Sequence, residues 1–110
     1  MINWDRVIEL RDEIGADDFQ EVVDLFLDEV EATLAGLQEA TAVSEVESIL
    51  HFLKGSALNL GFSGLAALCQ AGESAAAQGD VSQVDREEVL RLYTASKSEF
   101  IAQLTDRLAA

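Results

Sequence analysis

The sequence predicts an all-α protein that folds as an antiparallel four-helix bundle with a short additional N-terminal helix. The 110 residues contain no proline, and Ala, Leu, Glu and Gln, which favour helices, are abundant. Apolar residues recur every three or four positions in long segments, and glycines or short polar turns separate these segments. Because 49% of the residues are hydrophobic, the chain can fill one core, and we expect a single domain over residues 1–110.

The first two helices are delimited by their caps and their apolar spacing. We expect a short helix from about Trp4 to Ile14, with Asn3 as its N-cap and Gly15 at its C-terminal end. A long helix should follow, over about residues 17–40. Its apolar residues share one face: Phe19, Val22, Val23, Phe26, Val30, Leu34 and Leu37.

A capping box predicts the start of the third helix. Ser44 can accept a hydrogen bond from the first-turn amides, while Glu47, three residues later, reaches back to the cap. The helix should end near Gly61. On a helical wheel its inward-facing residues form one stripe: Val46, Leu50, Leu53, Ala57 and Leu60.

The last two helices are expected between further caps and turns. Ser63 should cap an alanine-rich helix that stops at Gly79-Asp80. Asp85 and Glu88 repeat the capping-box spacing before a final helix that runs to about residue 108. Four long amphipathic helices with short connections favour an antiparallel bundle, and the first helix should cover one end of it.

The charge of the chain excludes several kinds of partner. Acidic residues number 21 against 7 basic ones, a net charge of −14 that repels nucleic acids and anionic membranes. No stretch approaches the ~20 apolar residues of a membrane span, and the first residues do not resemble a signal peptide. We therefore expect a cytoplasmic monomer. The single cysteine, Cys69, is interpreted as a small buried side chain, not a disulfide or zinc ligand.

The third helix carries the only histidine of the chain, His51. On the wheel it points roughly 150° away from the centre of the apolar stripe, so it should face outward. Its neighbours on the outer stripe are Glu47, Lys54, Gly55 and Leu58.

Three of these neighbours indicate a site. Gly55 in a helix interior costs about 1 kcal/mol relative to alanine, and access for another protein's active site, close helix packing or simple tolerance of the glycine would each explain it. The Lys54 ammonium could offset the negative charge of a phosphoryl group on the His51 ring, although most lysines are simply solvated. Leu58 adds an exposed apolar contact of the kind that a docking partner covers.

One string within this helix resembles a known family. Residues 50–62 read Leu-His-Phe-Leu-Lys-Gly-Ser-Ala-Leu-Asn-Leu-Gly-Phe. This is similar to the signature of the histidine-containing phosphotransfer (HPt) family, a His-x-x-Lys-Gly core followed by small residues and a second glycine. Leu65, Leu68-Cys69 and the Gly79-Asp80 turn continue the resemblance, which covers nearly the whole chain.

Carried over residue by residue, the resemblance implies roles for the site. It implies that His51 is the phosphorylated residue, that Lys54 is the flanking cation and that Gly55 gives clearance for a receiver domain. Ser56 and Asn59 match family positions near the site, and we expect them, with Glu47 and Leu58, to contact the partner.

A glutamate on the next helix completes the implied site. In the chemotaxis-kinase branch of the family, a glutamate at the spacing of Glu73 accepts a hydrogen bond from one ring nitrogen of the phosphorylated histidine. The resemblance thus implies that Nε2 of His51 is the nucleophile. Gly72 departs from the family pattern, because many relatives carry a leucine there.

The function implied is that of a phosphocarrier in a two-component phosphorelay, without autonomous catalysis. The partners implied are receiver domains of response regulators and a (hybrid) histidine kinase. The receiver would supply its own carboxylates, lysine and Mg²⁺, so we expect the chain itself to need no cofactor or metal. Because phosphohistidine and phosphoaspartate are both reactive, transfer can run in either direction.

Three alternatives stay open at this point. A non-catalytic acidic helical adaptor would merely expose His51. Glu47 and His51, at i and i+4, could share a metal ion, although one histidine among many acids is weak evidence for a metal site. The chain could also be the phosphoacceptor module of a chemotaxis-type histidine kinase, and its start at methionine slightly favours a free-standing protein.

Overall fold

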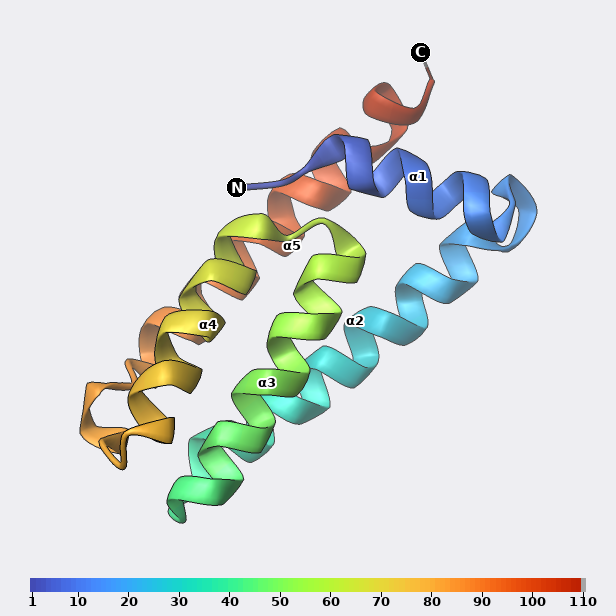
Figure 1. Cartoon of the computed structure of the whole chain (residues 1–110). Coiled ribbons are helices and arrows are strands. Elements are labelled where there is room, and N and C mark those ends of the chain that lie inside the picture. The colour runs from blue at the N-terminus through green and yellow to red at the C-terminus, as the bar shows by residue number, and fades with distance from the viewer. Residues whose placement is uncertain (110) are drawn as a thin grey trace.

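Five α-helices account for most of residues 1–109, the part of the chain that the computed structural model describes. Their bounds are α1 (Trp4–Ile14), α2 (Ala16–Glu39), α3 (Val43–Leu60), α4 (Ser63–Ala77) and α5 (Arg86–Leu108), and a 3₁₀ turn, Val81–Gln83, precedes α5 (Figure 1). No strand occurs in these residues. The prediction of an all-α protein is confirmed, and only the 3₁₀ turn was not expected.

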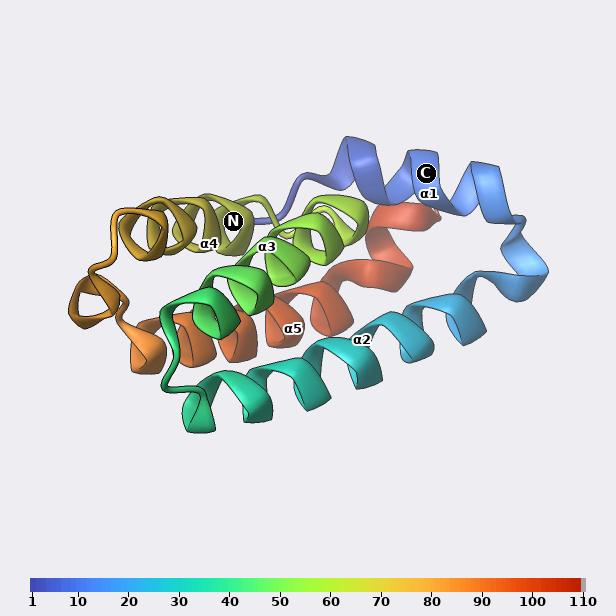
Figure 2. The same cartoon turned by 60° about the horizontal axis from the view of Figure 1, so that its bottom comes forward.

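Helices α2 to α5 form an elongated antiparallel bundle of about 45 × 20 × 19 Å. Figure 2 shows the bundle as two layers, with α3 and α4 lying over α2 and α5. Helix α1 crosses one end, beside the α3–α4 turn, as predicted (Figure 1). Within the described residues, no helix combines the length and the apolar character needed to cross a lipid bilayer.

The core is one cluster of buried apolar side chains to which all five helices contribute. The predicted inward stripe of α3 is buried in full: Val46, Leu50, Leu53, Ala57 and Leu60. On α2 the predicted face is correct in outline, but Leu27 replaces Val22 and Phe26 among the fully buried residues. Burying each large aliphatic side chain contributes roughly 1.5–3 kcal/mol, so this stripe fixes how α3 is rotated in the bundle. That rotation decides which residues of α3 face solvent.

Two of the predicted caps are confirmed. The Asn3 side chain accepts a hydrogen bond from the backbone N–H of Arg6 (3.3 Å), and Gly15 ends α1 with a φ of 100°. Asp85 caps α5, because its carboxylate accepts from the N–H of Glu88 (3.0 Å). These caps satisfy backbone donors that the first turn of each helix leaves free.

The predicted capping box at Ser44 is wrong. The Ala42 carbonyl already accepts from the N–H of Val46 (3.0 Å), so α3 begins at Val43, two residues earlier than the box requires. Ser44 therefore has helical backbone dihedrals, whereas an N-cap hydroxyl needs an extended residue. Without a cap to reach back to, Glu47 lies on the surface of the second turn.

Two further capping predictions are corrected in part. Ser63 is the first residue of α4 and not its cap, and its hydroxyl donates to the Met1 carbonyl (3.2 Å). Glu88 does not complete the box with Asp85, because its carboxylate forms an ion pair with Arg91 on the next turn.

The N-terminal segment holds the α3–α4 turn in place. The N–H of Asn3 donates to the Gly61 carbonyl (2.6 Å), and Gly61 has a left-handed φ of 80°. A Cβ at this position would lie 2.6 Å from the Asn3 carbonyl oxygen, so only glycine fits. Arg6 adds a second tie, because its guanidinium donates to the Asn59 carbonyl (3.3 Å). Residues preceding α2 thus fix the hairpin of α3 and α4.

Candidate functional site

His51 stands in the middle of α3, on the side that faces away from the core. Its neighbours Leu50 and Leu53 are fully buried, while 70% of the His51 side chain is exposed. The outward orientation predicted from the helical wheel is confirmed. The exposed imidazole can be reached by another macromolecule without any change in the fold.

Helix α4 supplies a carboxylate that contacts both His51 and Lys54. Nδ1 of His51 lies 2.6 Å from Oε2 of Glu73, and Nζ of Lys54 lies 2.8 Å from Oε1 of the same residue. Only 14% of the Glu73 side chain is exposed. The Lys54 ammonium also donates to Oε1 of Gln70 (3.0 Å), so it is held over α4 and not free in solvent. One carboxylate therefore fixes both the ring and the cation.

The charge state of Glu73 determines which ring nitrogen of His51 carries the proton. The hydrogen bond from Lys54 lowers the pKa of Glu73, the contact with His51 adds to this effect, and partial burial opposes it. The carboxyl is therefore ionised at neutral pH and can only accept hydrogen bonds. Nδ1 must then be the protonated nitrogen of the neutral ring, and Nε2 keeps its lone pair.

A substitution of Glu73 should release this tautomer preference. In Glu73→Gln the amide can donate a hydrogen bond as well as accept one, so the neutral His51 ring no longer favours the Nδ1–H tautomer over the Nε2–H tautomer. Ring ¹⁵N chemical shifts of the neutral imidazole should show mainly the Nδ1–H tautomer in the parent and a mixed population in the variant. A parent ring protonated mainly on Nε2 would contradict the assignment.

The pH dependence of the Glu73 contacts follows from the same lowered pKa. A group whose pKa is lowered in the folded state stabilises it above the ordinary carboxyl pKa, and this contribution is lost as the pH falls through the lowered value. The contacts with Lys54 and His51 should therefore persist to below the usual range of a glutamate. In Lys54→Ala the pKa of Glu73 should rise, which carboxyl ¹³C shifts followed through an acid titration would measure.

Gly72 explains how α4 comes close enough for Glu73 to reach His51. A Cβ at Gly72 would lie 3.0 Å from Cδ1 of Leu50, which is fully buried directly beside His51 in the sequence. A leucine here would press on Leu50 and separate the helices. The departure from the family pattern therefore does not displace Glu73.

Gly55 lies in open space one turn after His51. No atom lies within 4 Å of the position where its Cβ would be, and the residue is exposed. Close helix packing is thereby excluded as the reason for this glycine. The absence of a side chain leaves the side of His51 towards Gly55 uncovered.

Two shallow depressions flank His51. One, of about 330 Å³, lies between α2 and α3, and its lining comprises His51, Phe26, Glu29, Phe52, Gly55, Ser56 and Asn59. The other, of about 400 Å³, lies between α3 and α4, and its lining comprises His51, Ser44, Glu47, Ser48 and Glu73. The imidazole thus stands on a ridge with a hollow on either side.

The remaining predicted residues occupy different places around this ridge. Ser56 is largely buried at the floor of the first depression. Asn59 borders the same depression two turns from His51, and its carbonyl accepts a hydrogen bond from Arg6. Glu47 borders the second depression. Leu58 is 54% exposed but lines neither of them.

Several residues near the ridge were not predicted as part of the site, among them Gln70, Phe26 and Glu29, with Ser44, Ser48 and Phe52 also lining the depressions. Gln70 accepts from Lys54, and the sequence signal for it is its position one turn before Glu73 on the same helix face. Phe26 was assigned only to the core, and no role was assigned to Glu29. Both border the hollow next to His51, which depends on how α2 lies against α3.

Cys69 takes no part in the site. It is buried in α4, and burial, with a smaller effect of the Glu73 charge, raises the pKa of its thiol to about 12. The thiol is therefore not a nucleophile at neutral pH. This agrees with the interpretation of Cys69 as a small buried side chain.

Comparison with known families agrees with this geometry. The model of the Hpt domain family matches residues 21–110, which include α3, α4 and every residue that contacts His51. The chain belongs to the Hpt domain family. Hpt domains are phosphocarrier modules of two-component signalling and interact with receiver domains in phosphorelays. No match was found among curated proteins or among solved structures.

Proposed function

We propose that this chain is a single-domain phosphocarrier of the cytoplasm, which accepts a phosphoryl group on Nε2 of His51 and passes it to or from receiver-domain aspartates. The phosphorelay would also include a (hybrid) histidine kinase. The observation that supports this most strongly is the ring of His51: it is 70% exposed, and its Nδ1 is held by Glu73 at 2.6 Å. An exposed ring with one nitrogen fixed as a donor presents the other as a nucleophile.

The transfer step follows from the protonation state of the ring. The Nε2 lone pair attacks the phosphorus of an aspartyl phosphate, the N–P bond forms, and the P–O bond to the aspartate breaks to leave a carboxylate. The proton on Nδ1 stays in place, so the ring gains positive charge as it is phosphorylated. The Glu73 carboxylate lies where it offsets that charge, and the reverse step regenerates the neutral ring.

The partner would contribute the remaining catalytic groups. In this proposal the receiver's own carboxylates hold Mg²⁺, which neutralises charge on the transferred group, and its lysine adds a further cation. The carrier contributes a nucleophile of fixed orientation, so most of the rate enhancement comes from positioning and charge stabilisation at the partner's site. The carrier is then a substrate of its partners and not an enzyme.

We further propose that the ridge around His51 is the docking surface for the receiver. Gly55 would leave the approach clear, and the hollows beside the ring would accept loops of the receiver. Glu47, Ser56, Leu58 and Asn59 would contact the partner around the ridge. Phe26 joins this set because its ring borders the first hollow.

Phosphoryl exchange with a receiver tests this function. A receiver domain from the source organism, charged with ³²P from a small phosphodonor in Mg²⁺, is mixed with the full chain. We expect label to move to the chain in a form that is labile to acid and stable to base, as phosphohistidine is. If no receiver of that organism exchanges label with the chain, in either direction, the proposal is wrong.

Lys54 should assist the transfer without being essential. Its ammonium can turn from Glu73 and Gln70 towards the phosphoryl oxygens, because Lys54 lies one turn after His51 on the same helix. Lys54→Ala should slow transfer by about tenfold, the equivalent of about 1.4 kcal/mol, and leave labelling of His51 possible. Single-turnover exchange with a charged receiver measures this, and total loss of labelling in a folded variant would disprove the assisting role.

The contact with Glu73 favours a second form of the same function, the phosphoacceptor module of a chemotaxis-type histidine kinase. In that form the phosphoryl group comes directly from a kinase core with bound ATP. Incubation of the chain with such a core and labelled ATP, in the absence of any receiver, distinguishes the two. Rapid labelling of His51 would favour the kinase module, and labelling only through a receiver would favour the phosphorelay carrier.

A further inference from the structure

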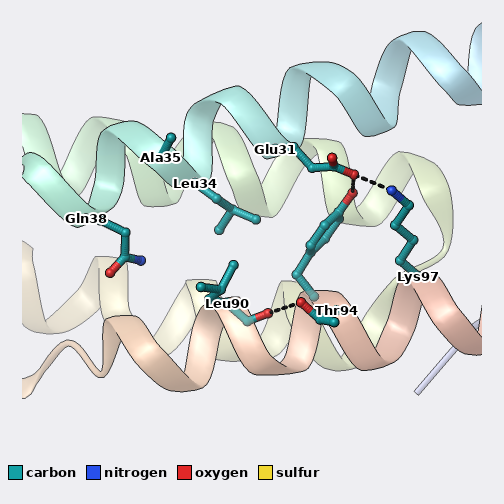
Figure 3. Close-up of a pocket in the computed structure, with 8 residues that line it drawn as sticks. Glu31, Leu34, Ala35, Gln38, Leu90, Thr94 and Lys97 are labelled. Atoms are coloured by element: carbon teal, nitrogen blue, oxygen red, sulfur yellow. Dashed lines mark hydrogen bonds and ion pairs between the residues drawn. The ribbon is translucent and has the colours of Figure 1, made fainter.

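A groove between α2 and α5 lies outside the site described above. Its larger depression, about 420 Å³, includes Leu34, Ala35 and Gln38 of α2 and Leu90 and Thr94 of α5 (Figure 3). Figure 3 shows the side chains of Leu34 and Gln38 pointing from α2 towards α5, with Leu90 facing them. A second depression, about 320 Å³, lies further along the same two helices, with Val23 and Leu27 facing Phe100, Ile101 and Leu104. The Glu31–Lys97 ion pair (2.6 Å) crosses from α2 to α5 between the two depressions.

The length of the groove fits a helix. Along α5 its lining runs from Leu90 to Thr105, a distance of roughly 22 Å at 1.5 Å per residue. Two apolar side chains stand exposed on this rim, Leu90 at 42% and Ile101 at 59%, three turns apart on one face. An apolar floor between two helices, with apolar anchors along one rim, is the geometry that receives the apolar face of a third helix.

The opposite rim is acidic. Asp24 and Glu31 of α2 line the two depressions, and Asp28 lies between them on the same helix face. Within residues 1–109, Glu31 is paired with Lys97 (2.6 Å), whereas Asp24 and Asp28 form no ion pair. The groove therefore has an apolar floor and unneutralised negative charge along one edge.

We infer that this groove binds a cationic amphipathic helix of about 15 residues from a partner protein. Leucine-like side chains on one face of that helix would fill the two depressions, and lysines or arginines along its edge would meet Asp24 and Asp28. A second copy of this chain is a poor occupant, because each copy carries a net charge of −14 and would bring acidic residues against an acidic rim.

The groove and the His51 ridge can be occupied at the same time. His51 lies on α3, in the layer opposite α2 and α5, and no residue named for the groove borders either hollow beside the ring (Figure 2). The groove and the two depressions beside His51 therefore share no lining residue. This arrangement would let the chain stay attached to one protein while His51 exchanges phosphoryl groups with another.

A synthetic peptide tests the inference directly. The probe is a peptide of about 16 residues, with leucines along one helical face and lysines elsewhere, titrated into the full ¹⁵N-labelled chain. A scrambled peptide of the same composition controls for attraction to a strongly acidic protein. We expect the amphipathic peptide to become helical on binding, and amide shifts to concentrate along α2 and α5. The scrambled peptide should bind at least about tenfold more weakly.

Surface variants make the test specific to the groove. Leu90→Ser combined with Ile101→Ser should raise the Kd for the peptide at least about tenfold, because both anchors are lost while no core residue changes. Leu25→Ser is the matched control, because Leu25 is 62% exposed on α2 but lines neither depression. This variant should bind the peptide with the same Kd as the parent chain.

Three outcomes would overturn the inference. They are the absence of binding at millimolar peptide, amide shifts centred on α3 and α4, and equal weakening by the Leu25 control. Sedimentation of the parent chain and of the double variant tests the alternative occupant, a second copy of the chain. If the parent is a dimer and Leu90→Ser with Ile101→Ser makes it a monomer, the groove binds a second copy instead.

Discussion

Replacement of His51 by glutamine is expected to abolish phosphoryl acceptance and to leave the fold intact. The side chain is 70% exposed and contacts the rest of the protein through Glu73, so its loss removes little packing. Stability to thermal or urea unfolding should change by no more than about 0.5 kcal/mol. Labelling by a charged receiver should fall by at least about a thousandfold, because the serine hydroxyls that border the ridge are far weaker nucleophiles than an imidazole lone pair.

The comparison needs a folded variant and a distinction between phosphoamino acids. Circular dichroism checks the helix content, and acid treatment after labelling separates phosphohistidine from phosphoserine. Acid-labile label that persists in His51→Gln would show that another group carries the phosphoryl, because the ring would then be dispensable.

Substitution of Gly55 should have the second large effect. It should raise or preserve the stability of the fold and lower the rate of phosphoryl transfer. Because nothing lies within 4 Å of its Cβ position, Gly55→Ala should stabilise the bundle by a few tenths to about 1 kcal/mol. Gly55→Gln should also stay folded, but its side chain would stand one turn from His51, in the path of a receiver. Reacting atoms must come within about 3 Å, and a displacement of 1 Å can cost about a hundredfold, so transfer should fall by about that factor.

The measurement is paired: thermal melting of Gly55→Gln beside its rate of phosphoryl exchange with a receiver. Gly36→Ala is a suitable control, because Gly36 is also inside a helix and its Cβ would make only an ordinary contact of 4.0 Å with Ile49. That variant should transfer at the parent rate. A folded Gly55→Gln that also transfers at the parent rate would show that the ridge does not need the clearance.

Features that depend on local sequence were predicted well. The apolar stripe of α3 follows from helical periodicity alone, and burying it leaves one possible direction for His51, outward. Asn3 and Gly15 could be placed because a cap and a stop act within one turn of the helix. Ser44 was wrongly placed because the N-cap lies two residues earlier, at Ala42, whose side chain cannot cap a helix and therefore gives no signal in the sequence.

Features that depend on how helices lie against one another were not accessible to the same reasoning. The contact between His51 and Glu73 was implied only by family resemblance, because the register of α4 against α3 is set by the close approach at Gly72. The second hydrogen bond of Lys54, to Gln70, depends on that same register. The groove between α2 and α5 was missed because Leu90 and Ile101 read as part of an ordinary amphipathic helix until the neighbouring helix is in place.

The position of the phosphorus atom on the ring tests the central claim most directly. The chain, labelled with ¹⁵N in its single histidine, is phosphorylated by a charged receiver and examined by ¹⁵N and ³¹P NMR. Because Glu73 holds the proton on Nδ1, a one-bond ³¹P–¹⁵N coupling should appear at Nε2 of His51 and at no other nitrogen. Coupling to Nδ1, or a phosphorylated chain without any coupling to His51, would contradict the account.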